Sequence, residues 1–228
     1  MLHTLSALLL DQSCYSCGRN LVSQEKMICF DCLGQIEWTR FAERPTDNEL
    51  YYRLAGKIPL AGATSLFYFD KAGRLQSLIQ HIKYKGALPL ARHLGFLLGQ
   101  SLEGQAFCEA ATQIVPVPLH WRRRWQRGYN QATEIGRGLQ KTTGMPLNLS
   151  VLARTNHRQT QTRLSGQARW QNVSDVFRVQ AEPPKQVLLL DDVITTGATL
   201  ESCARALLAH PQPPTKIYIA SIGMARKH

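Results

Sequence analysis

Two adjacent acids near the C-terminal end of the chain are the residues best suited to ligand chemistry. Asp191 and Asp192 follow four apolar residues, and the segment from 187 to 200 reads VLLLDDVITTGATL. An apolar run of this length is typical of a buried parallel strand. Because ligands of open α/β sheets bind beyond the carboxyl ends of the strands, we expect the two carboxylates to follow the strand and line a ligand site.

Small hydroxyl-bearing residues follow the acids and suit a phosphate group. A helical pattern starts directly after them, and the N–H groups and dipole at a helix start attract phosphate. Two carboxylates would repel a phosphate unless they hold an uncharged group attached to it, and ribose hydroxyls meet that need. No lysine precedes the hydroxyl residues, as a P-loop would require. The segment therefore predicts a 5-phosphoribosyl site, with the acids on the sugar and the 5-phosphate held by Thr195, Thr196, Gly197, Ala198 and Thr199.

A basic and aromatic segment carries the second candidate site. Residues 120–131 read HWRRRWQRGYNQ, between an expected strand and an expected helix. Arginine binds phosphate or pyrophosphate oxygens bidentately, and arginines interleaved with aromatic residues also suit single-stranded nucleic acid. A solvated basic helix end is the third alternative. The candidate for pyrophosphate is Arg122, and the candidates for nucleic acid are Arg123, Arg124, Trp125 and Arg127.

A long polar stretch from 154 to 172 shows little periodicity. Loops of this length in compact domains are usually functional or disordered, and a lid would exclude water from a ligand site. The arginines that such a lid would place on a pyrophosphate are Arg158, Arg163 and Arg169. A surface loop without a role is the alternative.

Four of the six cysteines form two CxxC pairs, Cys14 with Cys17 and Cys29 with Cys32. Two such pairs at this spacing can close a tetrahedral four-thiolate zinc site. Four thiolates leave no open coordination position, so the expected metal is structural. A redox role is the alternative, but the βαβ context of a thioredoxin-like CxxC is absent here.

Composition and charge restrict the class of protein. The chain has 228 residues, 44% of them hydrophobic, and a formal net charge of +11, which favours phosphate ligands or nucleic acid as partners. No apolar run approaches the ~20 residues of a membrane helix, and the start lacks the basic region of a signal peptide. We therefore expect a cytoplasmic protein without membrane insertion, in which cysteines stay reduced.

Strands and helices are expected to alternate along most of the chain. Apolar patterns predict strands at 63–69, 113–117, 176–179, 187–190 and 217–222, and helices at 75–82, 88–102 and 127–140. This alternation predicts an α/β fold with a doubly wound, mostly parallel sheet. The polar residues from 45 to 60 are interpreted as a linker.

Together these motifs resemble the ComF family, which is related to type I phosphoribosyltransferases. The resemblance covers almost the whole chain and rests on both CxxC pairs, on 82–86 (IKYKG), 117–120 (VPLH), 127–132 (RGYNQA), 158–164 (RQTQTRL) and 191–199 (DDVITTGAT). It implies a zinc module with a leading short helix at 1–44, the linker at 45–60, and a phosphoribosyltransferase-like domain at 61–228. It also implies a role in DNA uptake during natural transformation, beside a helicase of the uptake machinery.

The resulting hypothesis is a ComF-like protein that binds phosphoribosyl pyrophosphate with Mg²⁺ and contacts single-stranded DNA. In an enzyme, an acceptor nitrogen would displace pyrophosphate, and the catalytic residues Asp191 and Asp192 would orient the ribose. Mg²⁺ would be held mainly by ligand oxygens. Two alternatives stay open, because a fold does not establish catalysis. One is a non-catalytic nucleic-acid adaptor regulated by phosphoribosyl pyrophosphate, and the other is a nucleobase salvage phosphoribosyltransferase without a DNA role.

Overall fold

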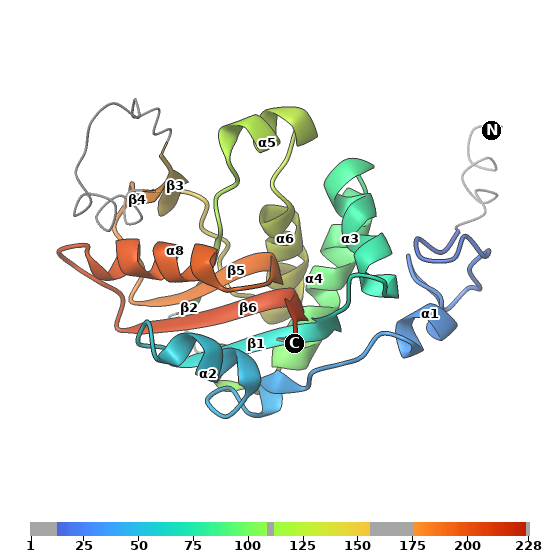
Figure 1. Ribbon diagram of the computed structural model, residues 1–228, viewed down its shortest axis with the longest axis horizontal. Helices are drawn as coiled ribbons and strands as arrows, with labels where there is room; N and C mark the ends of the chain where they lie inside the picture. The colour runs from blue at the N-terminus through green and yellow to red at the C-terminus, as the bar shows by residue number, and fades with distance from the viewer. Residues whose placement is uncertain (1–12, 109–111, 156–175, 227–228) are drawn as a thin grey trace.

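Four parallel strands form the centre of the molecule. The computed structural model describes residues 13–108, 112–155 and 176–226. In this part of the chain, one sheet has the order β1 (Gly62–Phe69), β6 (Lys216–Ala225), β5 (Gln186–Ile194) and β2 (Thr112–Pro116), shown in Figure 1. Each neighbouring pair is parallel, so the carboxyl ends of the strands meet at one edge of the sheet.

Helices cover both faces of this sheet (Figure 1). One face is covered by α3 (Arg74–Tyr84), α4 (Leu88–Leu102) and α6 (Gln131–Thr143), and the other by α2 (Glu49–Ala55) and α8 (Ala198–Leu208). Leu188 and Leu190 of β5 belong to the first core, and Val187 and Leu189 belong to the second. Burial on both faces explains why this strand has no polar alternation. The α/β fold with a doubly wound parallel sheet is confirmed.

A buried helix occupies the segment that the sequence predicts as a linker. Asn48 caps α2 by accepting the backbone N–H of Tyr51, and Leu50 and Leu54 are fully buried. The linker interpretation of 45–60 is therefore wrong over α2. Leu50 and Leu54 lie four residues apart in an otherwise polar helix, which is a weak signal in the sequence. Packing against the sheet determines the helical conformation. The domain boundaries themselves stay a prediction.

The basic segment between β2 and α6 forms a short helix of its own. α5 (Trp121–Arg127) is followed by Gly128, whose φ of 78° ends the helix. The helix predicted from residue 127 begins only at Gln131, because the side chain of Asn130 caps α6 by accepting the N–H of Ala132. Arginine, tryptophan and glutamine have no strong bias against helix, so nothing in their types enforces a loop.

The smaller elements lie outside the main sheet. β3 (Leu152–Arg154) and β4 (Phe177–Val179) form a separate antiparallel pair, so the strand expected at 176–179 does not join the central sheet. The short helices are α1 (Phe30–Gly34), η2 (Phe41–Glu43) and η3 (Ala106–Cys108). Within the described ranges, no helix combines the length and apolar character needed to cross a membrane.

Candidate functional site

The acidic pair lies within the last residues of β5. Asp191 is paired with Ser221 of β6, and Val193 is paired with Gly223, so the strand continues to Ile194. The expectation that the acids follow the end of the strand is therefore wrong, because pairing with β6 extends through them. Both side chains are half-buried, and the N–H of Asp192 donates to Oδ1 of Asp191 at 2.9 Å.

The surroundings of Asp191 favour its protonated form. Burial and the Asp192 carboxylate raise the pKa of Asp191 to about 7, although the N–H of Asp192 and the charge of Lys83 act in the opposite direction. The folded protein therefore binds this proton more tightly than the unfolded chain. The contribution of Asp191 to stability is full below the ordinary aspartate pKa and is lost as pH rises through about 7.

The titration of Asp191 gives a direct prediction. We expect its carboxyl group to titrate near pH 7, and Asp192→Asn to lower that midpoint, because removal of a neighbouring negative charge favours ionisation. Carbon-13 NMR of the side-chain carboxyl, assigned with Asp191→Asn, measures both midpoints. A wild-type midpoint at the ordinary aspartate value would contradict this description of the site.

Lys83 is the cation in contact with the acidic pair. Its Nζ lies 3.1 Å from Oδ2 of Asp192 and comes from the last turn of α3. Arg122, the predicted pyrophosphate residue, is exposed on α5, with its guanidinium carbon 5.3 Å from the ring centre of Trp121. Sequence reasoning assigned no role to Lys83, and its only signal was the IKYKG motif after a helical pattern.

The small-residue loop that follows β5 is open to solvent. Thr195, Thr196 and Thr199 are exposed, and the hydroxyl of Thr196 accepts the N–H of Ala198 at the start of α8. Gly197 has a φ of 81°, and a Cβ there would lie 2.5 Å from Cδ2 of Leu54, so only glycine fits. The loop therefore presents hydroxyls and the first N–H groups of a helix, which together suit an anion.

The buried side chain of Arg53 holds this loop in place. Nη1 of Arg53 donates to the carbonyl oxygens of Thr195 and Ala225, both at 2.8 Å, and Nη2 lies 2.6 Å from Oε1 of Glu49. Arg53 thereby joins the start of the loop to the end of β6. Sequence reasoning missed Arg53 because it lies on α2, within the presumed linker.

The basic helix presents aromatic and cationic side chains to solvent. Trp121 and Trp125 are 50% and 85% exposed and lie four residues apart on α5, so they share a face. Arg123 is also exposed, and the guanidinium carbon of Arg127 lies 5.2 Å from the ring centre of Tyr84. Arg124 lies on the same helix. The predicted lid residues lie outside the described residues; these are Arg158, Arg163 and Arg169.

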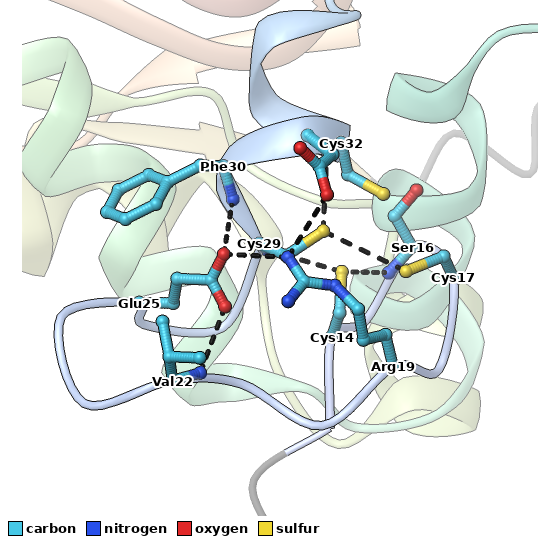
Figure 2. A network of polar contacts seen from close by, with 10 residues as sticks. Cys14, Ser16, Cys17, Arg19, Val22, Glu25, Cys29, Phe30 and Cys32 are labelled. Atoms are coloured by element: carbon cyan, nitrogen blue, oxygen red, sulfur yellow. Dashed lines mark hydrogen bonds and ion pairs between the residues drawn. The ribbon is translucent and has the colours of Figure 1, made fainter.

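The four paired cysteines form one cluster in the N-terminal part of the chain (Figure 2). Their sulfur atoms all lie within 4.8 Å of one another, and Sγ of Cys17 is 3.8 Å from Sγ of Cys29. A tetrahedral zinc ion with Zn–S bonds of about 2.3 Å has S–S edges of about 3.8 Å. All six cysteines are free thiols, so no disulfide competes for these sulfurs. The cluster could hold a structural metal ion.

Backbone N–H groups around the cluster favour thiolates. The N–H of Cys29 donates to Sγ of Cys14, and the N–H of Cys32 donates to Sγ of Cys29. Burial alone would raise the pKa of Cys29, but the N–H of Cys32, the neighbouring thiols and Arg19 lower it to about 6. Burial and the other thiols raise the pKa of Cys32 to about 12. The pKa values of Cys29 and Cys32 are therefore shifted in opposite directions. A divalent cation among the four sulfurs would favour the thiolate form of all four cysteines.

A buried glutamate holds the loops that carry the cysteines (Figure 2). Oε1 of Glu25 accepts the N–H of Phe30 at 2.8 Å and an Nη2 hydrogen bond from Arg19 at 2.8 Å, while Oε2 accepts the N–H of Val22 at 3.0 Å. These bonds join the residues between the two CxxC pairs to the start of α1. Cys14, Cys29 and Cys32 belong to the same buried cluster as the residues of α3. The segment that carries the cysteines therefore packs directly against α3.

Curated proteins similar to this chain are competence and DNA-utilization proteins. Competence protein F of Haemophilus influenzae is 34% identical over 205 residues, which cover 85% of this chain and 90% of that protein. DNA utilization protein YhgH of Escherichia coli is 29% identical over 153 residues, covering 65% and 67%. Competence protein ComFC of Bacillus subtilis is 33% identical over 95 residues, covering 42% and 38%. No family model matches the chain.

Solved structures show weaker similarity. The orotate phosphoribosyltransferase from Aeropyrum pernix is 17% identical with a TM-score of 0.33, covering 79% of each chain. A glutamine phosphoribosylpyrophosphate amidotransferase from B. subtilis is 19% identical with a TM-score of 0.37, covering 57% of this chain and 25% of that one. Family membership therefore follows from the similar sequences and not from these structures.

Proposed function

This chain belongs to the ComF family, and on this premise we propose that it binds phosphoribosyl pyrophosphate at the β5–α8 junction and single-stranded DNA at α5 during DNA uptake. The first half is carried by one observation, the acidic pair at the end of β5 with an exposed threonine-rich loop directly after it. The second half is supported by the exposed basic helix and by relatives named for competence and DNA utilization.

The proposed ligand lies with its sugar on the acids and its 5-phosphate on the loop. Asp191 and Asp192 accept hydrogen bonds from the ribose hydroxyls, and Thr195 to Thr199 donate to the phosphate. Hydrogen bonds to charged groups contribute about 1.5–3 kcal/mol each. In this proposal Mg²⁺ is held mainly by ligand oxygens, since it gives up its water reluctantly. Calorimetric titration with phosphoribosyl pyrophosphate and Mg²⁺ tests the binding.

Catalysis is a separate part of the proposal, since the fold hosts both enzymes and binding proteins. In an enzyme, an acceptor nitrogen forms a bond to the anomeric carbon while the bond to pyrophosphate breaks. We propose to measure pyrophosphate release with candidate bases, using Asp191→Asn with Asp192→Asn as the background. Base-dependent release supports a transferase. Ligand binding without release supports a non-catalytic adaptor, and release without any DNA affinity supports a salvage enzyme.

Binding of single-stranded DNA should depend on salt and on α5. Each phosphate contact contributes a slope of about 0.7 in a plot of log affinity against log salt, so Arg123→Ala with Arg124→Ala should lower the slope by up to about 1.4. Trp125→Ala should cost about 1–3 kcal/mol if a base stacks on the exposed ring. Fluorescence anisotropy with an oligothymidylate measures both effects.

The matched control for this experiment removes two positive charges elsewhere. Lys141 at the end of α6 and Arg178 on β4 are exposed and lie outside α5. Their double alanine variant should keep the wild-type slope. If the wild type shows no oligonucleotide binding even at low salt, the DNA half of the proposal is wrong.

We further propose that zinc occupies the cysteine cluster as a structural ion. Four thiolates at tetrahedral spacing are the donor set that zinc prefers, and they leave no position for a substrate. Such a site is favoured in a reducing compartment, so the proposal places the protein in the cytoplasm. A helicase of the uptake machinery is the proposed protein partner, supported only by the family resemblance.

A further inference from the structure

A basic pocket lies between α3 and α5, directly beside the acidic pair. It has a volume of about 390 Å³ and is lined by Lys83, Tyr84 and Gly86 from the end of α3, and by Arg123, Arg127 and Tyr129 from α5 and the turn after it. The lining includes three cationic side chains and no carboxylate. The volume lies within the range of small-molecule sites, so the pocket has room for a phosphate-bearing group.

The walls of the pocket are held in place by the residues that follow α5. The hydroxyl of Tyr129 donates to the carbonyl oxygen of Ile82, which joins this turn to the last turn of α3. Gly86 and Gly128 both have positive φ, of 68° and 78°, and allow the sharp turns on either side. Unpaired carbonyl groups at the C-terminal end of a helix repel an anion. The Ile82 carbonyl already accepts the hydrogen bond from Tyr129, so it opposes an anion in the pocket less than an unpaired carbonyl would.

The cations of the pocket are arranged for an anion. Arg127 lies over the ring of Tyr84, with its guanidinium carbon 5.2 Å from the ring centre. An arginine over an aromatic ring can still donate its in-plane N–H groups to an anion. Lys83 is 26% exposed and pairs with Asp192, which is 14% exposed. Since Lys83 both lines the pocket and contacts Asp192, the pocket and the proposed sugar site are separated by a single ion pair.

We propose that this pocket is a second phosphate-binding site, which holds a phosphate group through Lys83, Arg123 and Arg127 and is distinct from the loop at Thr195 to Thr199. Only the source of the phosphate rests on the proposed function. One source is the pyrophosphate end of a ligand whose sugar lies on Asp192. The other is a backbone phosphate of a strand bound along α5. The chemistry of recognition is the same for both.

The test uses Lys83→Gln and Arg127→Gln, each of which removes one cation from the pocket. Calorimetry with inorganic pyrophosphate and anisotropy with an oligothymidylate provide the two readouts. We expect each variant to lose about tenfold or more in affinity for at least one probe, since each loses a charge-assisted hydrogen bond. Lys141→Gln, an equal charge change at the far end of α6, should change neither affinity. Arg127→Lys should restore part of the loss and show that the fold is intact.

The two probes distinguish the sources and the alternatives. A loss confined to pyrophosphate assigns the pocket to the sugar ligand, and a loss confined to the oligonucleotide in both Lys83→Gln and Arg127→Gln assigns it to the strand. Unchanged affinities for both probes in both variants would overturn the assignment of the pocket as a phosphate-binding site. A loss of pyrophosphate affinity in Arg122→Gln, with the affinities of Lys83→Gln and Arg127→Gln unchanged for both probes, would overturn it and place the pyrophosphate at Arg122. If the wild type binds pyrophosphate here but does not bind phosphoribosyl pyrophosphate, the proposed function fails while the pocket stands.

Discussion

Replacing Cys29 with serine is expected to release the metal ion and unfold the N-terminal module. Cys29 is 1% exposed, and its sulfur lies among those of the three other cysteines. A serine hydroxyl does not ionise as a thiol does and cannot replace the lost thiolate. Binding of structural zinc contributes about 10–16 kcal/mol in small zinc-binding peptides, which exceeds what this small module can recover from other contacts.

The larger domain should keep its sheet in the Cys29→Ser variant. β1, β6, β5 and β2 bury their own core against helices on both faces, but the module shares a buried cluster with α3. We therefore expect a lower melting temperature with retained α/β circular dichroism. Elemental analysis after purification without chelators gives the metal content. Cys108→Ser makes the same chemical change outside the cluster and should keep one metal ion per chain.

Two results would contradict this account of the module. One is a wild-type protein that contains no metal when purified without chelators. The other is a Cys29→Ser variant that retains a full equivalent of zinc, since the three remaining cysteines would then suffice.

Features encoded within a short segment could be predicted from the sequence. The run from 187 to 190 indicates a strand buried on both faces, and the structure places it at the centre of the sheet. The two CxxC pairs likewise predict a four-sulfur cluster, because each pair needs only a local turn to bring its sulfurs together. In both cases the spacing of residue types contains the relevant information.

Features that depend on distant partners could not be predicted in this way. Arg53 holds a loop 142 residues further along the chain, and Lys83 meets Asp192 only because α3 ends beside β5. The extension of β5 through the acids depends on its pairing with β6. Apolar spacing identifies elements, but it does not specify which polar side chains face one another after the sheet has formed.

Changing both acids to amides, Asp191→Asn with Asp192→Asn, should weaken binding of phosphoribosyl pyrophosphate by a factor of about 100 or more. Measured above pH 7, where Asp191 is ionised, each carboxylate would lose a charge-assisted hydrogen bond of about 1.5–3 kcal/mol to the sugar, and about 1.4 kcal/mol corresponds to a factor of ten. The free energy of unfolding of the protein without ligand should change little. Asp191 carries a burial cost when ionised, and the partly exposed Lys83–Asp192 pair contributes at most about 1 kcal/mol.

A control variant makes the same chemical changes outside the site. Asp47 and Glu103 are exposed acids, and each lies in a segment that leads into the amino end of a strand, Asp47 before β1 and Glu103 before β2. The double variant Asp47→Asn with Glu103→Gln should therefore bind the ligand as the wild type does. This control separates an effect of the site from an effect of net charge.

The most direct test of the central claim is calorimetric titration of phosphoribosyl pyrophosphate, with Mg²⁺ present, into the wild type, the control variant and the Asp191→Asn with Asp192→Asn variant. The account predicts one ligand per chain for the first two proteins and a loss of about 100-fold or more for the third. Equal affinity in all three proteins would contradict the assignment of the acidic pair to the sugar. Absence of binding to the wild type would contradict the phosphoribosyl site as a whole.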